Sequence, residues 1–166
     1  MTYEEFASSR LPALLRYAVM LTGDRHSAED LVQEAMVRAQ LNWRRIARTG
    51  APDRYVRRIL TNLFIDWRRG SWVRRVLLRP EPDDSVPEVG DHVQRAADRD
   101  EVWALLAALP RRQRAALVLR FYEDLADGEI AEILGCAVGT VRAHISRALG
   151  TLRAELAPAY ESGVRR

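Results

Sequence analysis

A stretch rich in proline and acidic residues divides this chain, and it constrains the fold more than any other feature. Residues 79–91 read RPEPDDSVPEVGD, with three prolines, a glycine and no repeating apolar position. Such a segment cannot bury enough apolar surface to build a core. Arginines outnumber acidic residues on both sides of it, which indicates two modules. We therefore predict a flexible acidic linker over residues 71–100, small domains over 1–70 and 101–160, and a short tail, 161–166.

The composition restricts the classes of protein to consider. The chain has 166 residues, of which 48% are hydrophobic and 30% charged, as in ordinary folded domains. No apolar run approaches the roughly 20 residues that a membrane span needs, and the first residues are acidic where a secretory signal would be basic. Cys136 is the single cysteine, and the three histidines are scattered. We expect a cytoplasmic protein with no disulfide, metal site, cofactor, catalytic residues or membrane insertion.

Helical periodicity predicts three helices in the first domain. The first ends at Gly23, and the second begins at Ser27, whose hydroxyl would cap it with Asp30 three residues later. A loop over residues 48–53 precedes the third helix, which begins near Arg54. The apolar stripes are Leu11, Leu14, Leu15, Ala18 and Val19 in the first helix, Leu31, Val32, Ala35, Met36 and Ala39 in the second, and Val56, Ile59, Leu60, Leu63 and Trp67 in the third.

The third helix also has a polar face. At 100° per residue, the positions opposite its apolar stripe are Arg58, Thr61, Asn62, Ile65 and Arg69. For an isolated helix, a solvated basic face is the simplest interpretation. A nucleic-acid-binding surface is favoured here because the Thr61 hydroxyl and the Asn62 amide can hydrogen-bond to a base, whereas arginines alone would bind mainly phosphates.

The second domain contains a helix-turn-helix pattern. A short helix over residues 127–134, a turn over 135–137 and a longer helix over 138–156 match this motif, whose second helix enters the major groove of DNA. Ordinary helical hairpins also have this outline, but here small residues and arginines share the outer face. That face comprises Gly139, Thr140, Ala143, Ser146 and Arg147, with Arg142 and His144 at its edges.

Three segments resemble, in order, regions 2.2, 2.3–2.4 and 4 of bacterial extracytoplasmic-function (ECF) sigma factors of the sigma-70 family, in particular the SigE-like actinobacterial type. They read AEDLVQEAMVRAQLNW (28–43), YVRRILTNLFIDWRR (55–69) and LPRRQRAALVLRFYEDLADGEIAEILGCAVGTVRAHISRALGTLR (109–153). The resemblance implies an all-α chain with two small helical domains, regions 2 and 4. It also implies a non-enzymatic subunit that directs promoter-specific transcription.

The resemblance assigns roles to particular residues. Asp30, Gln33 and Glu34 match the helix that binds the clamp helices of the largest subunit of core RNA polymerase. The −10 DNA-binding residues would be Arg58, Thr61, Asn62 and Arg69, next to a loop, 47–53, that receives a flipped base. The −35 DNA-binding residues would be Gly139, Thr140, Arg142, Ala143, His144 and Arg147. Partners would be core polymerase, including its flap, and promoter DNA, and an anti-sigma factor is left open.

Two other functions compete with this interpretation. A stand-alone helix-turn-helix regulator would bind DNA without polymerase and use its first domain to sense a signal or dimerise. The DLVQE sequence beside a basic helix argues against a sensor, because it suggests no ligand pocket. A hydrolytic or RNA-processing enzyme ranks third, since the chain has no evident carboxylate pair or Ser/His/Asp grouping. Ala137 and the pair Ala143-His144 depart from the family's usual residues, so no −35 sequence is predicted.

Overall fold

The computed structural model describes residues 1–67 and 101–163, with side chains placed as far as residue 157. The predicted all-α fold is confirmed, because the described residues form helices joined by turns and no strand. The predicted linker lies outside the described residues. The helices in chain order are α1 (Tyr3–Thr22), α2 (Arg25–Leu41), α3 (Trp43–Arg48), α4 (Pro52–Asp66), a short unlabelled helix at 101–107, α7 (Arg111–Phe121), α8 (Asp127–Leu134) and α9 (Val138–Gly163).

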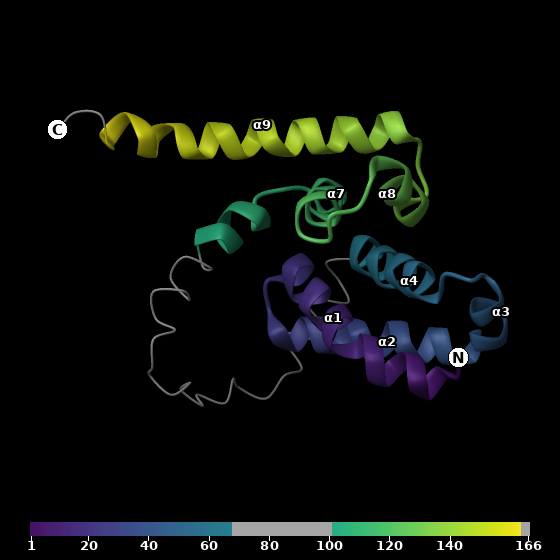
Figure 1. Ribbon diagram of the computed structural model, residues 1–166. Helices are drawn as coiled ribbons and strands as arrows, with labels where there is room; N and C mark the ends of the chain where they lie inside the picture. The colour runs from purple at the N-terminus through teal and green to yellow at the C-terminus, as the bar shows by residue number, and fades with distance from the viewer. Residues whose placement is uncertain (68–100, 164–166) are drawn as a thin grey trace, which may run out of the picture.

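The first half of the chain forms a layer of α1, α2 and α4, with α3 at one end (Figure 1). α1 packs along α2, and α2 packs against α4. Large side chains fill the space between them, and the most deeply buried include Phe6, Leu14, Tyr17, Leu31 and Leu60. Each is at most 1% exposed, so this layer contains a real hydrophobic core.

The boundaries of α1 follow from local signals, although its start was not predicted. Thr2 and Glu5 form a capping box, with the Glu5 amide donating to Thr2 Oγ1 over 3.2 Å and the Thr2 amide donating to Glu5 Oε2 over 2.9 Å. The predicted end is confirmed, since Gly23 has φ of 74°, a left-handed value that glycine adopts at little cost. Leu11, which belongs to the predicted apolar stripe, is 43% exposed, so the stripe is buried from Leu14 onward.

The predicted N-cap of α2 is wrong by one turn. Asp24, not Ser27, caps the helix, and its carboxylate accepts from the amides of His26 and Ser27 over 3.2 and 3.1 Å. Ser27 lies inside the first turn, is buried, and donates its hydroxyl to Asp24 Oδ2 over 2.7 Å. Both residue types make good caps, and Asp24 takes the role because it directly follows the Gly23 turn.

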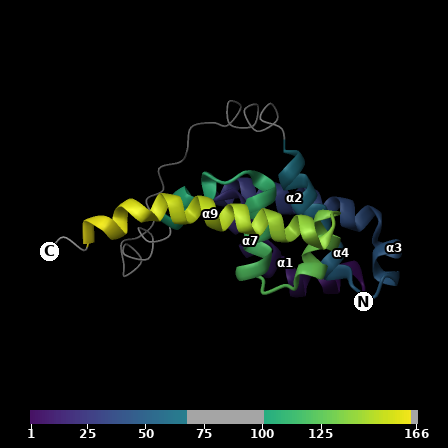
Figure 2. The ribbon, with the colours of Figure 1, turned by 90° about the horizontal axis from the view of Figure 1, so that it is seen from above.

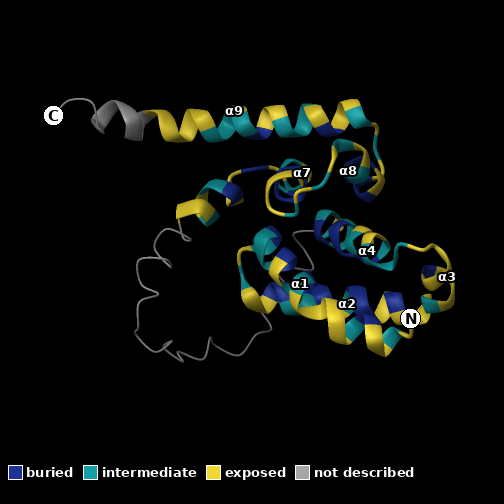
Figure 3. Cartoon of the chain, in the orientation of Figure 1, coloured by how far each residue is buried: buried dark blue, intermediate teal, exposed yellow. Residues whose placement is uncertain are grey.

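The second half of the chain forms an upper layer in which α9 lies across α7 and α8 (Figures 1 and 2). Gly135, with φ of 65°, ends α8, and α9 begins three residues later, so the predicted helix-turn-helix arrangement is confirmed. Val141 and Ala148 anchor the first half of α9 in the core. The helix continues to Gly163, past the predicted end at 156, and its far half projects beyond the body (Figures 1 and 3).

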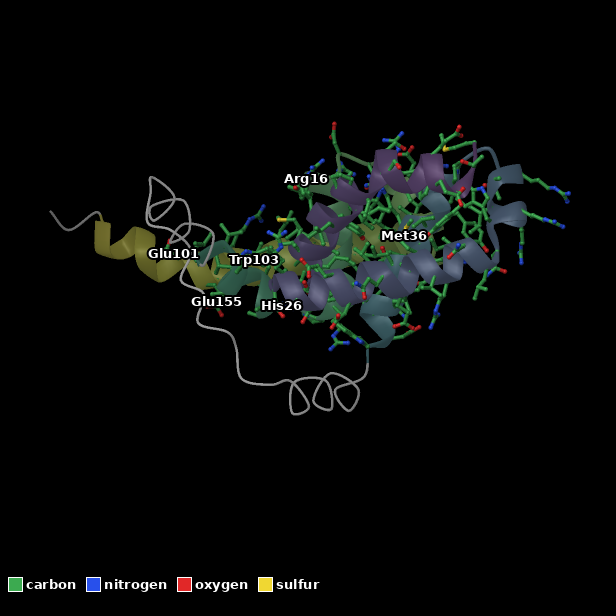
Figure 4. The ribbon with its side chains drawn as sticks, turned by 90° about the horizontal axis from the view of Figure 1, so that it is seen from below. Arg16, His26, Met36, Glu101, Trp103 and Glu155 are labelled. Carbon is green, nitrogen blue, oxygen red and sulfur yellow. The ribbon has the colours of Figure 1, made fainter. Side chains whose placement is uncertain are left out.

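The two layers are packed against each other. α4 lies on α8 and α7, and α1 also contacts α7. One hydrophobic cluster runs across the junction and includes Val56, Leu60 and Phe64 of α4 together with Ile130 and Ile133 of α8. At the other end of the junction, a Cβ on Gly23 would lie 3.3 Å from the Trp103 ring (Figure 4 labels Trp103). In this conformation the two predicted domains share a core.

Candidate nucleic-acid interface

The outer face of α2 carries the three residues predicted to bind a protein partner. Gln33 is exposed, while Asp30 and Glu34 are half-buried, and Glu34 accepts from Arg38 Nη2 over 2.8 Å one turn further on. Val37 and Leu41 continue the same face and are 55% and 80% exposed. Sequence reasoning missed these two, although their spacing from Gln33, at i+4 and i+8, could have identified them. Exposed apolar side chains beside polar ones are typical of protein-binding surfaces.

The structure contradicts the predicted outward position of Thr61. Its side chain is fully buried between α4 and α1, where it cannot reach DNA in this conformation. Thr61 Oγ1 donates to the Arg57 carbonyl over 2.7 Å and lies 2.7 Å from the Tyr17 hydroxyl. Since the threonine proton is already used, Tyr17 donates to Thr61. The helical wheel placed Thr61 opposite the apolar stripe and therefore outward, but α4 is packed on two sides and buries a wider arc than that stripe.

This chain of hydroxyls predicts an asymmetry in stability. Thr61→Val leaves the buried Tyr17 hydroxyl without its acceptor, which costs about 1–3 kcal/mol of unfolding free energy. Tyr17→Phe leaves Thr61 bonded to the Arg57 carbonyl and should cost less. Urea denaturation of both variants measures the difference. The double variant should lose less unfolding free energy than the sum of the losses of the two single variants. If the two losses simply add, the two hydroxyls are not coupled.

The other predicted residues of α4 are only partly available. Arg58 is exposed and Asn62 half-buried, while Arg69 lies outside the described residues. The turn at residues 49–51 precedes α4, so the predicted loop is shorter than expected; α3 occupies its first residues and Pro52 begins the helix. Arg58 and Asn62, one turn apart, therefore form the part of the predicted polar face of α4 that remains accessible.

Two arginines of α4 that were not predicted as site residues face the second half of the chain. Arg54 Nη2 and Nη1 lie 3.0 Å from Glu129 and 3.0 Å from Glu132 of α8. Arg57 bonds to Glu123, which follows α7, and to Asp53 Oδ2 over 2.8 Å. Burial alone would lower the pKa of Arg57, but the hydrogen bonds and charges of Glu123 and Asp53 outweigh it and raise that pKa. Arg57 is therefore a fixed cation at the junction.

The outer face of α9 has the composition predicted for a DNA-reading helix. Gly139, Thr140, Ser146 and Arg147 are exposed, and Ala143 is half-buried. A Cβ added at Gly139 would meet nothing within 4 Å, so the surface there is open to a partner. Small residues at this end leave room for close approach of a DNA backbone or base edge.

Two predicted residues at the edges of this face are more constrained. Arg142 is exposed, but its Nε donates over 3.1 Å to Asp127 Oδ2, and Arg120 also bonds to that carboxylate. The Arg142 hydrogen bond is the main reason that the pKa of Asp127 is lowered. His144 is half-buried, and its Nδ1 is buried without a hydrogen-bond partner among the described residues. Burial first, and then the charges of Arg112 and Arg147, lower the pKa of His144, which favours the neutral form of the ring.

The described residues show neither a metal centre nor a membrane span. No group of three or more His, Cys, Asp or Glu side chains among them is placed to hold a metal ion. Within the same described part, no helix is both long and apolar enough to cross a bilayer. Cys136 has a free, half-buried thiol in the turn before α9.

Comparison with known proteins shows the class to which this fold and these surfaces belong. Residues 6–74 match the family model for sigma-70 region 2, and residues 99–152 match that for sigma-70 region 4. The RNA polymerase sigma-E factor of Streptomyces avermitilis is 38% identical over 93% of this chain and 84% of its own length. The ECF RNA polymerase sigma factor SigL of Mycobacterium tuberculosis is 36% identical over 99% of this chain and 90% of its own.

A solved structure supports the same assignment. The sigma factor RpoE of Bartonella quintana, crystallised with the anti-sigma factor NepR, is 25% identical and superposes with a TM-score of 0.68, covering 93% of this chain and 96% of that one. The chain therefore belongs to the ECF group of the sigma-70 family, as its motifs indicated. Sigma factors are transcription initiation factors, which supports the predicted non-enzymatic class of function.

Proposed function

We propose that this ECF sigma factor binds core RNA polymerase through α2, contacts the −10 and −35 promoter elements through α4 and α9, and helps to open the DNA. The observation that carries this proposal is the exposed face of α9, where Gly139 and Thr140 directly follow the helix-turn-helix bend and Arg147 lies about two turns further along the helix. The polar face of α2 lies in the opposite layer of the molecule from α9 (Figure 1). Separate faces allow polymerase and DNA to be bound at once.

Reconstitution with core polymerase tests the function as a whole. We expect the purified protein to produce promoter-dependent transcripts only when core polymerase is present, and to bind the same promoter weakly without it. A stand-alone helix-turn-helix regulator would instead bind its site tightly without polymerase and would not program transcription. That second result would overturn the proposal. A protein of the anti-sigma class is a third candidate partner, and it would be recognised by its ability to block the transcripts.

The α2 face yields a prediction about polymerase binding. The double variant Gln33→Ala/Glu34→Ala removes an exposed amide and a carboxylate beside Val37 and Leu41. We expect it to weaken binding to core polymerase by at least about tenfold, or about 1.4 kcal/mol, because truncating a residue at the energetic centre of an interface costs about 2 kcal/mol or more. Fluorescence anisotropy of labelled protein titrated with core polymerase measures this. Glu4→Ala/Ser8→Ala, two exposed changes on α1, is the matched control and should bind normally; equal affinities of both variants would exclude α2 as the contact.

The polar face of α4 yields a prediction about DNA opening. Asn62 is half-buried beside the exposed Arg58, so its amide is held in a limited set of directions. We expect Asn62→Ala to reduce open-complex formation more than closed-complex binding, because an amide contacts unpaired bases and an arginine holds phosphates in either state. Permanganate reactivity of −10 thymines measures opening. If reactivity equals that of the wild type at saturating holoenzyme, Asn62 has no part in opening.

A further inference from the structure

An open cavity lies where the second half of α1 meets the short helix over residues 101–107. Its volume is about 680 Å³, within the range of about 300–1,000 Å³ for sites that hold small molecules. We propose that it binds a small amphipathic anion, with a carboxylate or sulfonate group at one end and an apolar body at the other. None of its described lining residues belongs to the surfaces proposed for polymerase or DNA, so the proposal goes beyond that function.

The walls of the cavity are mostly apolar. On α1, Leu15 precedes Val19 and Met20 by about one turn, so the three side chains share one side of the helix. Val102 and Trp103 of the short helix supply further apolar surface. The described chain covers all five side chains only in part. Apolar surface that faces water in a concave site favours the binding of an apolar group.

The Trp103 ring is held in a fixed position. Three atoms of its six-membered ring would lie 3.3, 3.6 and 3.7 Å from a Cβ on Gly23, so the ring packs directly against the turn that ends α1. Trp103 and Met20 also pack against the buried cluster that contains Leu106 and Leu109. A site whose walls are fixed before binding loses little conformational freedom when a ligand enters. The cavity is therefore preformed.

The charged groups at the cavity are two arginines. Arg16 of α1 and Arg25 at the start of α2 contribute to its lining, and no acidic side chain among the described residues does so. Arg25 Nε lies 3.0 Å from Glu29 Oε1, so part of its charge is offset, whereas Arg16 forms no ion pair with a described residue. Figure 4 labels Arg16 on α1 and Trp103 on the neighbouring short helix. The cavity therefore combines apolar walls with a cation that has no described partner.

These features restrict the class of ligand. A guanidinium donates parallel hydrogen bonds to the oxygens of an acidic group, which favours an anion over a neutral ligand. The hydroxyl of Tyr122, which also lines the cavity and bonds to no described residue, is a further donor there. A ligand with many charges would place some of them against Leu15 and Val19, which is unfavourable. A single negative charge on an alkyl or aromatic body fits the cavity best.

A fluorescent amphipathic anion tests the site on the full chain. Anilinonaphthalene sulfonate emits strongly only in apolar surroundings, and we expect it to bind saturably, with one dye molecule per chain. We expect octanoate to displace the dye. Neutral octanol has the same number of carbons but cannot form an ion pair with Arg16, so it should displace the dye at least about fivefold less well. Naphthoate in place of octanoate distinguishes an aromatic body from an alkyl one.

Two variants locate the site, each with a control that makes the same chemical change elsewhere. Arg16→Gln removes the proposed anchor, and its control is Arg44→Gln, at an exposed arginine of α3. Val102→Glu places a negative charge at the cavity, and its control is Val37→Glu on α2; the two valines are 49% and 55% exposed, so neither change disturbs the core. We expect each site variant to weaken dye and octanoate binding by at least about fivefold, and each control to bind as the wild type does.

Several results would contradict the proposal. Absence of saturable dye binding overturns it, and so does a bound dye that neither octanoate nor naphthoate displaces. If octanol displaces the dye as well as octanoate does, or if Arg16→Gln binds like Arg44→Gln, the cavity does not select anions. If Val102→Glu binds like Val37→Glu, the dye lies on another surface. Circular dichroism of the four variants checks that each retains its helices.

Discussion

Leu60→Ala is expected to lower the unfolding free energy by about 2–5 kcal/mol, the range for removing a fully buried leucine side chain. Leu60 is 0% exposed and lies in the cluster that joins α4 to the other helices. Domains of this size are stable by only about 5–15 kcal/mol. Leu60→Ala should therefore remove a large fraction of the total unfolding free energy. The cavity left by the leucine side chain would be bounded by several helices, and they cannot all move inward to fill it.

Denaturant titration followed by circular dichroism measures this effect. The matched control is Leu41→Ala, which makes the same chemical change at a residue that is 80% exposed and should alter stability by no more than about 0.5 kcal/mol. If Leu60→Ala lowers the unfolding free energy no more than Leu41→Ala does, the buried junction around α4 does not form in solution.

Arg147→Ala is expected to change −35 recognition most strongly. Arg147 is exposed near the centre of the outer face of α9, and a bidentate contact from arginine to guanine is worth about 1–3 kcal/mol, or about 5- to 150-fold in discrimination. Arg142 is instead held toward α8 by Asp127, a position suited to the DNA backbone. We expect Arg147→Ala to reduce the preference among −35 sequences and Arg142→Ala to weaken all of them alike.

Holoenzyme binding to a panel of −35 variants at two salt concentrations separates these roles. Losing a phosphate contact lowers the slope of log affinity against log salt concentration by about one unit. Losing a base contact mainly reduces the differences in affinity among the −35 sequences. Arg153→Ala, an exposed change two turns nearer the end of the same helix, is the control and should not alter sequence preference. If Arg147→Ala leaves both the order of affinities for the −35 variants and the differences between those affinities unchanged, α9 does not read bases through Arg147.

The features that sequence predicted best depend on neighbours along the chain. The ends of α1 and α8 at Gly23 and Gly135 follow from the left-handed backbone that glycine accepts. The helix-turn-helix spacing likewise needs only a short helix, a glycine and an amphipathic helix. The cap of α2 was misplaced between Asp24 and Ser27 because both residue types cap well, and only the three-dimensional turn selects between them.

The features that sequence could not predict depend on distant residues. Thr61 is buried because Tyr17, on another helix, supplies its hydrogen bond. Arg54 and Arg57 are polar residues on a basic helix, and nothing local indicates that their partners are Glu129 and Glu123. Packing of α4 on α1 buries the predicted DNA-binding residue Thr61, and packing between the two halves pairs Arg54 and Arg57 with acidic residues. The polar faces of α2 and α9 were located correctly because they remain on the outside.

The length of α9 has a mechanical consequence. At 1.5 Å per residue, its 26 residues form a rod about 39 Å long. The first half is fixed by Val141 and Ala148, whereas residues 153–157 are all exposed. A tilt of about 10° about one end of such a rod moves the other end by about 7 Å. The end that moves is the exposed C-terminal end, since Gly139 and Thr140 lie next to the buried Val141; a force applied near the C-terminus therefore acts on a long arm and changes the angle of the opposite tip more than its position.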